Sequence, residues 1–240
     1  MTRTVVHGAG RMARRVLHHL PDFEHLELIG LVSRTRPEDE PGIEWYPSLL
    51  ELNTAADLLI DFTLPGGTRI AADWCGANNV ALLSGTTGLT HEDVEALRSA
   101  SLNVPVLWAP NLSHGVALMQ ALVRQVANAL EPSAKISIND IHHIHKLDAP
   151  SGTALALADA VMEGRIGTPC EQSEPVFSSV REGDVVGEHT VRFALPDEVI
   201  EITHKALDRD VFARGALRAA QWLVQQAPGY YSTGDWLGLR

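Results

Sequence analysis

Residues 4–13 read Thr-Val-Val-His-Gly-Ala-Gly-Arg-Met-Ala, and this stretch decides the fold. The run before Gly8 predicts a strand, and the run after it predicts a helix that continues to Leu20. Between them stands the pattern G-x-G-x-x-A. Gly8 permits a tight turn, Gly10 lets a pyrophosphate approach the backbone, and the small Ala13 lets helix and strand pack closely. The order strand, glycine turn, helix predicts a dinucleotide-binding unit; a glycine turn in an unrelated α/β protein is the alternative.

The next predicted strand, residues 26–33, leads into Ser33-Arg34-Thr35-Arg36. An enzyme that prefers NAD usually places a carboxylate here, where it binds the ribose 2′-hydroxyl. Ser33 and Arg34 would instead bind a 2′-phosphate through charge-assisted hydrogen bonds. The sequence therefore predicts NADPH as the cofactor, with NADH as the second candidate; arginines that are merely solvated in a loop are the alternative.

Strands alternate with helices as far as Leu130, which predicts a parallel, doubly wound sheet. Ligands of such sheets lie at the carboxyl ends of the strands. Ordinary turn chemistry also gathers at strand ends, but five turns at one edge favour a cofactor crevice. The turn residues are Gly8, Ser33, Thr63, Gly85-Thr86-Thr87 and Ala109-Pro110-Asn111.

After Leu130 the pattern changes. Residues 134–142 alternate with period two, which predicts a strand with one covered face. The fold class predicted is α/β: an N-terminal Rossmann-type doubly wound parallel sheet with a second α+β domain for substrate binding and oligomerisation. The first domain is expected to comprise residues 1–112 plus 208–240, because the tail is expected to return to it, and the second to comprise residues 113–207. The later elements expected are a helix over about 153–163, strands over 176–180, 185–195 and 199–204, and an amphipathic helix over 209–226.

A second informative stretch is Asp140-Ile-His-His-Ile-His-Lys-Leu-Asp-Ala-Pro-Ser-Gly-Thr-Ala154. Pro150 disfavours the helical conformation at Ala149, and Ser151 is a good N-cap for a helix that starts near Thr153. The N–H groups of that first turn, with the helix dipole, attract an anion. Imidazoles and an ammonium group beside such a helix end predict a pocket for a carboxylated substrate that contains a proton donor.

The histidine cluster has two other interpretations. His142, His143 and His145 are zinc-type ligands, but on a strand His142 and His143 point to opposite faces, and no cysteine or nearby glutamate completes a set. No metal site is therefore predicted. Histidines that are buried and satisfied by backbone hydrogen bonds are the other interpretation, which we expect for His204.

Residues 142–154 resemble the signature of the dihydrodipicolinate reductase (4-hydroxy-tetrahydrodipicolinate reductase) family of the lysine pathway. Four other parts of the chain are similar to this family: Gly10-Arg-Met, Ile-Asp-Phe-Thr-x-Pro, Ser-Gly-Thr-Thr-Gly and Ala-Pro-Asn-x-Ser-x-Gly. The tail after Gly229 is similar as well. The chain departs from the family pattern at Leu112, where Phe is usual, and in a glycine turn that is one residue shorter and ends in Ala13.

The resemblance implies that a nicotinamide hydride reduces a cyclic, conjugated imine with two carboxylates, and that the resulting carbanion or enamine is then protonated. His142 matches the family's proton donor and Lys146 its second acid or cation. An imidazole titrates near neutral pH, whereas an ammonium group can hold developing negative charge, and the sequence does not separate the two roles. The resemblance also implies a homotetramer built through the β-rich domains. It implies a substrate site of His143, Gly152 and Thr153, and a cofactor site of Gly8, Ala9, Gly10, Arg11, Met12, Ser33, Arg34, Gly85, Thr86, Thr87, Ala109, Pro110, Asn111 and Leu112.

Composition excludes several classes of partner. A formal net charge of −11 over 240 residues argues against nucleic acid and anionic membranes, which both require a basic surface. The sequence has no continuous apolar span and no signal-peptide pattern, so a cytoplasmic protein is expected. Cys75 and Cys170 fit no metal or redox spacing and are expected to be free thiols.

Two rival functions remain to be weighed. Another two-domain Rossmann oxidoreductase, such as an amino-acid dehydrogenase, would explain the glycine turn but not the histidine and lysine stretch. A nucleotide-sensing regulator without turnover would need a DNA-binding element, which neither the charge nor a helix-turn-helix pattern supports.

Overall fold

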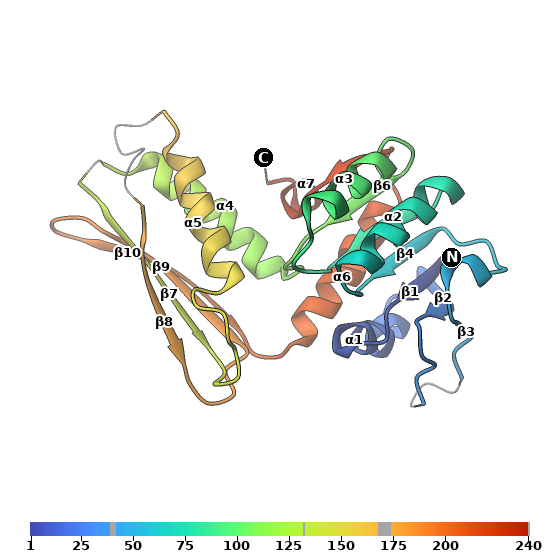
Figure 1. Cartoon of the computed structure of the whole chain (residues 1–240). Coiled ribbons are helices and arrows are strands. Elements are labelled where there is room, and N and C mark those ends of the chain that lie inside the picture. Colours follow the sequence, from blue (N-terminus) through green and yellow to red (C-terminus); the bar gives the residue numbers. More distant parts are fainter. Residues whose placement is uncertain (39–41, 132, 168–173, 240) are drawn as a thin grey trace. The chain divides into compact units, whose positions relative to one another are not determined.

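The computed structural model describes residues 1–38, 42–131, 133–167 and 174–239, and the chain forms two compact units (Figure 1). Unit 1 comprises Met1–Ser113 and Asp210–Gly238; unit 2 comprises His114–Arg209 together with Leu239. The chain therefore crosses between the units after Ser113 and after Arg209.

Unit 1 is built on a seven-stranded parallel sheet with the strand order β11-β6-β5-β4-β1-β2-β3. This sheet confirms the predicted Rossmann-type class. Its elements are β1 (Thr2–His7), α1 (Arg11–His19), η1 (Leu20–Asp22), β2 (Leu26–Val32), β3 (Trp45–Tyr46), η2 (Leu49–Glu51), β4 (Leu58–Asp61), α2 (Pro65–Asn78), β5 (Ala81–Ser84), α3 (His91–Ala100), β6 (Pro105–Trp108), α6 (Asp210–Leu223), β11 (Gly229–Tyr231) and α7 (Thr233–Leu237).

The strands of this sheet bury side chains on both faces, because each face is covered by helices. On one face Ile60 and Leu83 pack with Val16 of α1 and Ala216 of α6. On the other face, strand residues such as Leu59 pack against α2 and α3, through Ala71, Ala72, Cys75 and Leu97. Continuous apolar runs such as residues 58–60 are therefore a consequence of two covered faces. Cys75 is a buried free thiol, and Cys170 lies outside the described residues.

Helix starts in unit 1 follow local chemistry. Thr90 caps α3 through a capping box in which its hydroxyl accepts from the Asp93 N–H and the Asp93 carboxylate accepts from the Thr90 N–H. Pro65 is the first residue of α2, where its missing N–H costs nothing. No helix in the described part of the chain is long and apolar enough to cross a membrane.

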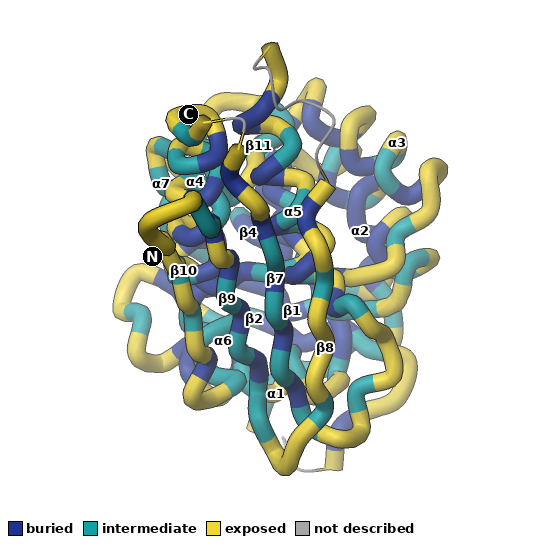
Figure 2. The backbone as a smooth tube through the Cα atoms, turned by 90° about the vertical axis from the view of Figure 1, so that its left-hand side faces the viewer, coloured by how far each residue is buried: buried dark blue, intermediate teal, exposed yellow. Residues whose placement is uncertain are grey.

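Unit 2 contains a four-stranded mixed sheet with the order β10-β9-β7-β8, in which only the β7–β8 pair is parallel among the pairs described. One face is covered by two helices, whose Val123 and Leu157 pack on Ile138 and Phe193. Figure 2 views the sheet with these helices behind it, and the strands alternate between buried and more exposed residues. Its elements are α4 (His114–Ala129), β7 (Lys135–His142), α5 (Gly152–Arg165), β8 (Val176–Arg181), β9 (Gly187–Ala194) and β10 (Val199–Ala206).

Gly215 lets α6 approach the backbone that follows β6. A Cβ at this position would lie 1.9 Å from the carbonyl oxygen of Leu112, and this obstacle is backbone rather than a movable side chain. We expect Gly215→Ala to lower the free energy of unfolding by about 1–3 kcal/mol, as overpacking does. Gly66 in α2 is the control, because a Cβ there meets nothing within 4 Å. Gly66→Ala should be neutral or stabilising by up to about 1 kcal/mol. Denaturant unfolding measures both, and equal losses would contradict the packing argument.

Candidate active site

The glycine turn of unit 1 combines a left-handed glycine with a helix start that has no side-chain cap. Gly8 has φ +108°, a region that L side chains rarely adopt, and a Cβ there would lie 2.5 Å from the Phe62 carbonyl oxygen. Gly10 is exposed and precedes α1 without a side-chain cap, and the first turn of α1 has no acidic residue. Backbone N–H groups at an uncapped helix start fit a pyrophosphate. Ala13 is fully buried against the sheet, as predicted.

The loop after β2 is held by its own hydrogen bonds. The Ser33 hydroxyl donates to the Thr35 carbonyl oxygen at 2.8 Å and accepts from the Trp45 indole N–H at 3.1 Å. Arg34 and Arg36 are exposed. Ser33 thus shapes the loop, while the two arginines supply its positive charge.

A buried carboxylate, Asp61, organises the carboxyl ends of β1, β4 and β5. Its Oδ2 accepts from Thr68, Ser84 and Thr86 at 2.6, 2.8 and 3.0 Å. Its Oδ1 accepts from Thr63 at 2.7 Å and lies 3.2 Å from His7 Nδ1. Burial raises the pKa of Asp61, but His7 and the hydroxyl donors outweigh it, so that its pKa is lowered. The carboxylate is therefore kept ionised inside the unit.

Two predicted cofactor residues point into the protein rather than outward. Thr86 is 3% exposed, donates to Asp61 and accepts from the Thr63 N–H, while Leu112 is 2% exposed and packs in the core. The remaining turn residues differ in exposure: Thr87 and Pro110 are exposed, Ala9, Met12, Gly85 and Asn111 are half-buried, Arg11 is exposed and Ala109 is buried.

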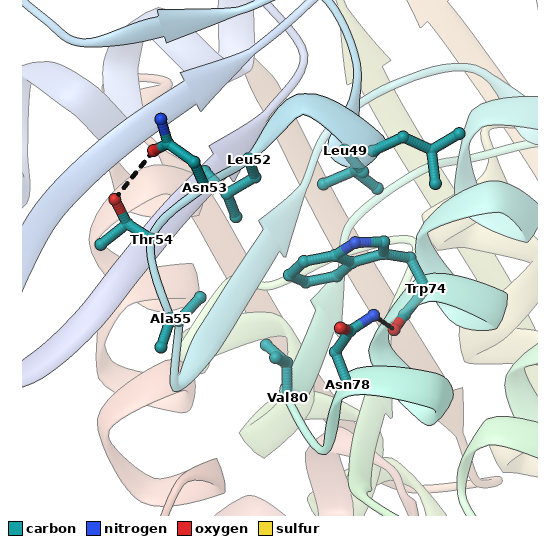
Figure 3. A pocket seen from close by; sticks show the side chains of 10 residues that line it. Leu49, Leu52, Asn53, Thr54, Ala55, Trp74, Asn78 and Val80 are labelled. Atoms are coloured by element: carbon teal, nitrogen blue, oxygen red, sulfur yellow. Dashed lines mark hydrogen bonds between the residues drawn. The ribbon is translucent and has the colours of Figure 1, made fainter.

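A separate hollow in unit 1 lies at the amino ends of β4 and β5 (Figure 3). Its lining includes Leu49, Asn53, Trp74 and Val80, which precede β4 and β5 or belong to α2. Asn53 accepts hydrogen bonds from the hydroxyls of Tyr46 and Thr54. Because these residues lie at the amino ends of the strands, the hollow is distinct from the candidate cofactor edge.

In unit 2 the predicted helix start is confirmed. Ser151 is the N-cap of α5, and its hydroxyl accepts from the Ala154 N–H at 3.2 Å. The predicted anion position is in use by the chain itself: the Asp148 carboxylate pairs with Lys146 Nζ at 2.9 Å, and the backbone N–H of Gly152 contributes to lowering the pKa of this carboxylate. The Lys146 hydrogen bond is the main cause of the lowered pKa of Asp148.

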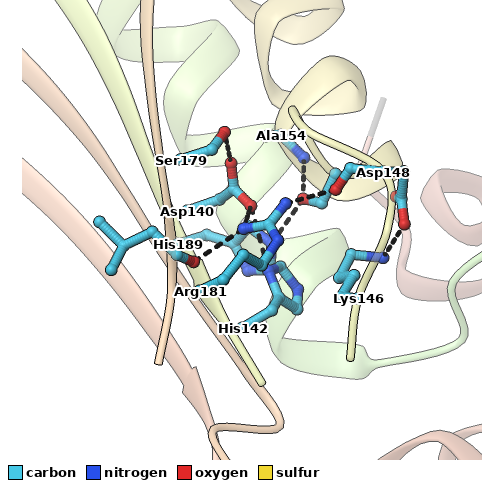
Figure 4. A network of polar contacts seen from close by, with 10 residues as sticks. Asp140, His142, Lys146, Asp148, Ala154, Ser179, Arg181 and His189 are labelled. Atoms are coloured by element: carbon cyan, nitrogen blue, oxygen red, sulfur yellow. Dashed lines mark hydrogen bonds and ion pairs between the residues drawn. The ribbon is translucent and has the colours of Figure 1, made fainter. Parts of the chain in front are cut away.

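His142 ends β7 and belongs to a buried polar network (Figure 4). Its Nδ1 lies 3.1 Å from Oδ2 of Asp140, which also accepts from Arg181 Nη1 at 3.0 Å. The other oxygen of Asp140 accepts from the Ser179 hydroxyl at 2.5 Å. Burial raises the pKa of Asp140, yet its three partners bring it below the usual value.

The two histidines of this network, His142 and His189, have lowered pKa values in the free protein. Burial and then the positive charge of Lys146 lower the pKa of His142, and Asp140 opposes them. His189 lies edge-on to His142 with ring centroids 5.0 Å apart, and its Nε2 is 3.2 Å from the Ser151 hydroxyl. Burial lowers the pKa of His189 to about 4, so this ring is neutral near neutral pH.

His143 lies just after β7 and is half-buried, and partial burial together with the charge of Arg209 lowers its pKa. Thr153 is half-buried in the first turn of α5. No three His, Cys, Asp or Glu side chains gather as metal ligands would among the residues that the structure describes.

Sequence reasoning missed the carboxylate and guanidinium groups around His142. Asp140 carried a usable signal, because it stands two residues before His142 on a strand and must share its face. Arg181 and His189 had no such signal, because they come from later strands and join the network only through the sheet pairing.

The fold and this site define the class. A Rossmann-type sheet with a glycine turn, joined to an α+β unit that carries a histidine and a lysine, is the arrangement of two-domain reductases that depend on a pyridine nucleotide. Family models described as dihydrodipicolinate reductase, N-terminus, and dihydrodipicolinate reductase, C-terminus, match residues 2–112 and 115–237. The chain belongs to the dihydrodipicolinate reductase family.

Individual relatives agree with this membership. The 4-hydroxy-tetrahydrodipicolinate reductase of Alkalilimnicola ehrlichii is 40% identical and covers 98% of both chains. That of Anaeromyxobacter dehalogenans is 39% identical over 100% of this chain and 99% of its own. Among solved structures, a dipicolinate-bound dihydrodipicolinate reductase from Paenisporosarcina sp. TG-14 has the same fold, with a TM-score of 0.84 at 23% identity and 98% coverage of both chains.

Proposed function

We propose that this chain reduces the cyclic dicarboxylate named in its relatives, 4-hydroxy-tetrahydrodipicolinate or its dehydrated form, with NADPH as the preferred reductant. The observation that carries the proposal is the pair His142 and Lys146 beside the α5 helix start, in a chain whose other unit has the glycine turn of a nucleotide site. Reaction with a small anion is consistent with local positive charge on an acidic protein.

The reduced nicotinamide of NADPH, when bound, would supply a hydride. The chain's own residues then have three tasks: to hold the substrate carboxylates, to stabilise negative charge and to deliver a proton. Lys146 now binds the Asp148 carboxylate beside the first turn of α5, so a substrate carboxylate would take over Lys146 and the N–H of Gly152. His143 and Thr153 are the further proposed substrate contacts. His142 delivers the proton from Nε2, because its Nδ1 is engaged by Asp140.

The proposed nucleotide contacts are the turn residues at the carboxyl edge of the unit 1 sheet. Gly8, Ala9, Gly10, Arg11 and Met12 would hold the pyrophosphate through backbone N–H groups. Thr86 and Leu112 would contribute backbone rather than side chain, because both side chains are buried. The further proposed contacts are Gly85, Thr87, Ala109, Pro110 and Asn111.

Selectivity for NADPH is assigned to the loop after β2. We expect Arg34→Ala to weaken NADPH binding by about 1.5–3 kcal/mol while NADH binding is unchanged, because only NADPH has the 2′-phosphate that accepts a charged hydrogen bond. Fluorescence titration with both nucleotides measures the two dissociation constants, and Arg36→Ala is the matched control from the same loop. Equal losses for NADPH and NADH with Arg34→Ala would contradict the assignment.

The assay that tests the function couples the chain to dihydrodipicolinate synthase and follows NADPH oxidation at its absorbance band. Oxidation that depends on the synthase product supports the proposal. Oxidation with amino or keto acids in its place would favour the amino-acid dehydrogenase alternative, and nucleotide binding without any turnover would favour a regulator.

We further propose a homotetramer formed through unit 2. The sheet face turned away from α4 and α5 has cross-strand polar pairs that a partner sheet can cover, such as Thr190 with Thr203 at 2.9 Å and Arg192 with Glu201 at 3.3 Å. Ile141 of β7 and Val180 of β8 are paired in register on this face. Light scattering after size-exclusion chromatography measures the mass, and a monomer at micromolar concentration would overturn the proposal.

A further inference from the structure

Asp140 has no assigned part in the reaction, yet it is the most fully enclosed group that contacts His142. It is 0% exposed, and both of its oxygens are used by side chains from β7 and β8. We infer that Asp140 is the positioning residue for His142 in the reduction proposed above: it fixes the imidazole with the proton on Nδ1 and leaves Nε2 to exchange a proton with the substrate.

The geometry allows one tautomer. An ionised carboxylate only accepts hydrogen bonds, so Nδ1 of His142, 3.1 Å from Oδ2, must carry the hydrogen. Nε2 faces Gly187 of β9, where a Cβ would lie 3.1 Å away, so the glycine leaves room beside the reactive nitrogen. A histidine oriented by a carboxylate on one nitrogen and reactive on the other is the general arrangement of positioned acid–base groups.

Arg181 links the Asp140–His142 pair to the loop that carries Lys146. Its Nη1 donates to Asp140, and its Nη2 donates to the backbone carbonyl of Asp148. The side chain of Asp148 in turn pairs with Lys146. The groups that face His142 are thus Asp140 on β7, Arg181 on β8, the neutral His189 on β9 and Lys146 in the following loop. The Asp140 carboxylate orients the His142 ring, while the positive charges of Arg181 and Lys146 oppose its protonation, so the ring is not held as an imidazolium.

Asp140→Asn tests the inference, because it keeps the shape of the side chain and removes its charge. We expect kcat to fall roughly 10- to 100-fold, the size seen when a partner orients a histidine, with the KM for NADPH unchanged. The alkaline limb of kcat/KM should move to lower pH, because the carboxylate that favours the imidazolium is gone. Nitrogen-15 NMR of labelled histidines should show that His142 loses its fixed Nδ1–H tautomer.

Two further variants keep the inference falsifiable if Asp140→Asn folds poorly. Ser179→Ala removes a hydrogen bond from the other oxygen of Asp140 and should leave both the pH limb and the tautomer in place. Asp140→Glu retains the carboxylate and should recover part of kcat. A fall in kcat for Asp140→Asn with an unchanged pH limb and an unchanged tautomer would mean that Asp140 is only structural. The NMR result decides the inference even if the coupled assay refutes the proposed substrate.

Discussion

His142→Gln should lower kcat roughly 10²- to 10⁴-fold, while the dissociation constant for NADPH stays at its wild-type value. Glutamine fills a similar volume and can still hydrogen-bond with Asp140, but it has no titratable proton to deliver. The proposed nucleotide contacts lie in unit 1 and His142 in unit 2, so we expect the change to leave cofactor binding unaffected. Stopped-flow turnover and nucleotide titration measure the two quantities.

The pH dependence separates His142 from Lys146. Because the pKa of free His142 is lowered by burial and by Lys146, its protonated form is lost below neutral pH, and kcat/KM should fall as pH rises through that value. A bound dicarboxylate favours the imidazolium, so the corresponding fall in kcat should lie at higher pH. His145→Gln, an exposed histidine of the same loop, is the control and should keep full turnover. Intact turnover in His142→Gln would make Lys146 or water the proton donor.

Asp61→Ala should lower the free energy of unfolding by roughly 3–5 kcal/mol, because it leaves buried hydroxyls and His7 without their common acceptor. Asp57→Ala is the matched control, since this aspartate lies just before the same strand. It pairs with Arg3 at 2.7 Å, and the two side chains are 39% and 43% exposed. Such a pair contributes about 1 kcal/mol or less.

Lowering the pH should cause part of the stability loss that we expect for Asp61→Ala. The folded pKa of Asp61 is lowered, so its contribution to stability is complete above the unfolded pKa of about 4 and is lost as pH falls through the folded value. Urea unfolding at a series of pH values measures the slope, which Asp61→Ala should flatten. Equal stability losses for Asp61→Ala and Asp57→Ala would show that the buried hydroxyls find other acceptors.

The sequence alone determined the turns, helix starts and strands that depend on residues close together in the chain. The glycine turn fixes the link between β1 and α1, because Gly8 has a backbone conformation that other residues rarely adopt. Ser151 and Thr90 fix helix starts, because a cap needs only the chain within three residues. Period-two alternation over residues 134–142 likewise predicted β7, whose buried face packs on α4 and α5. Short strands such as β3 and β11 were missed, because two or three residues show no period.

Only the tertiary structure decided which side chains meet. Thr86 carries a local signal for a cofactor loop, yet its hydroxyl turns to Asp61, a residue of the neighbouring strand. Asp140 meets Ser179 and Arg181, which lie 39 and 41 residues later in the chain, because β8 pairs with β7 in parallel. Spacing along a chain sets backbone conformation, whereas strand order and register set contacts between distant segments. His142 could therefore be proposed as the proton donor from its own stretch, and Asp140 two residues before it shares its face of the strand. Arg181 and Ser179, which contact Asp140 from β8, could not be found in that stretch.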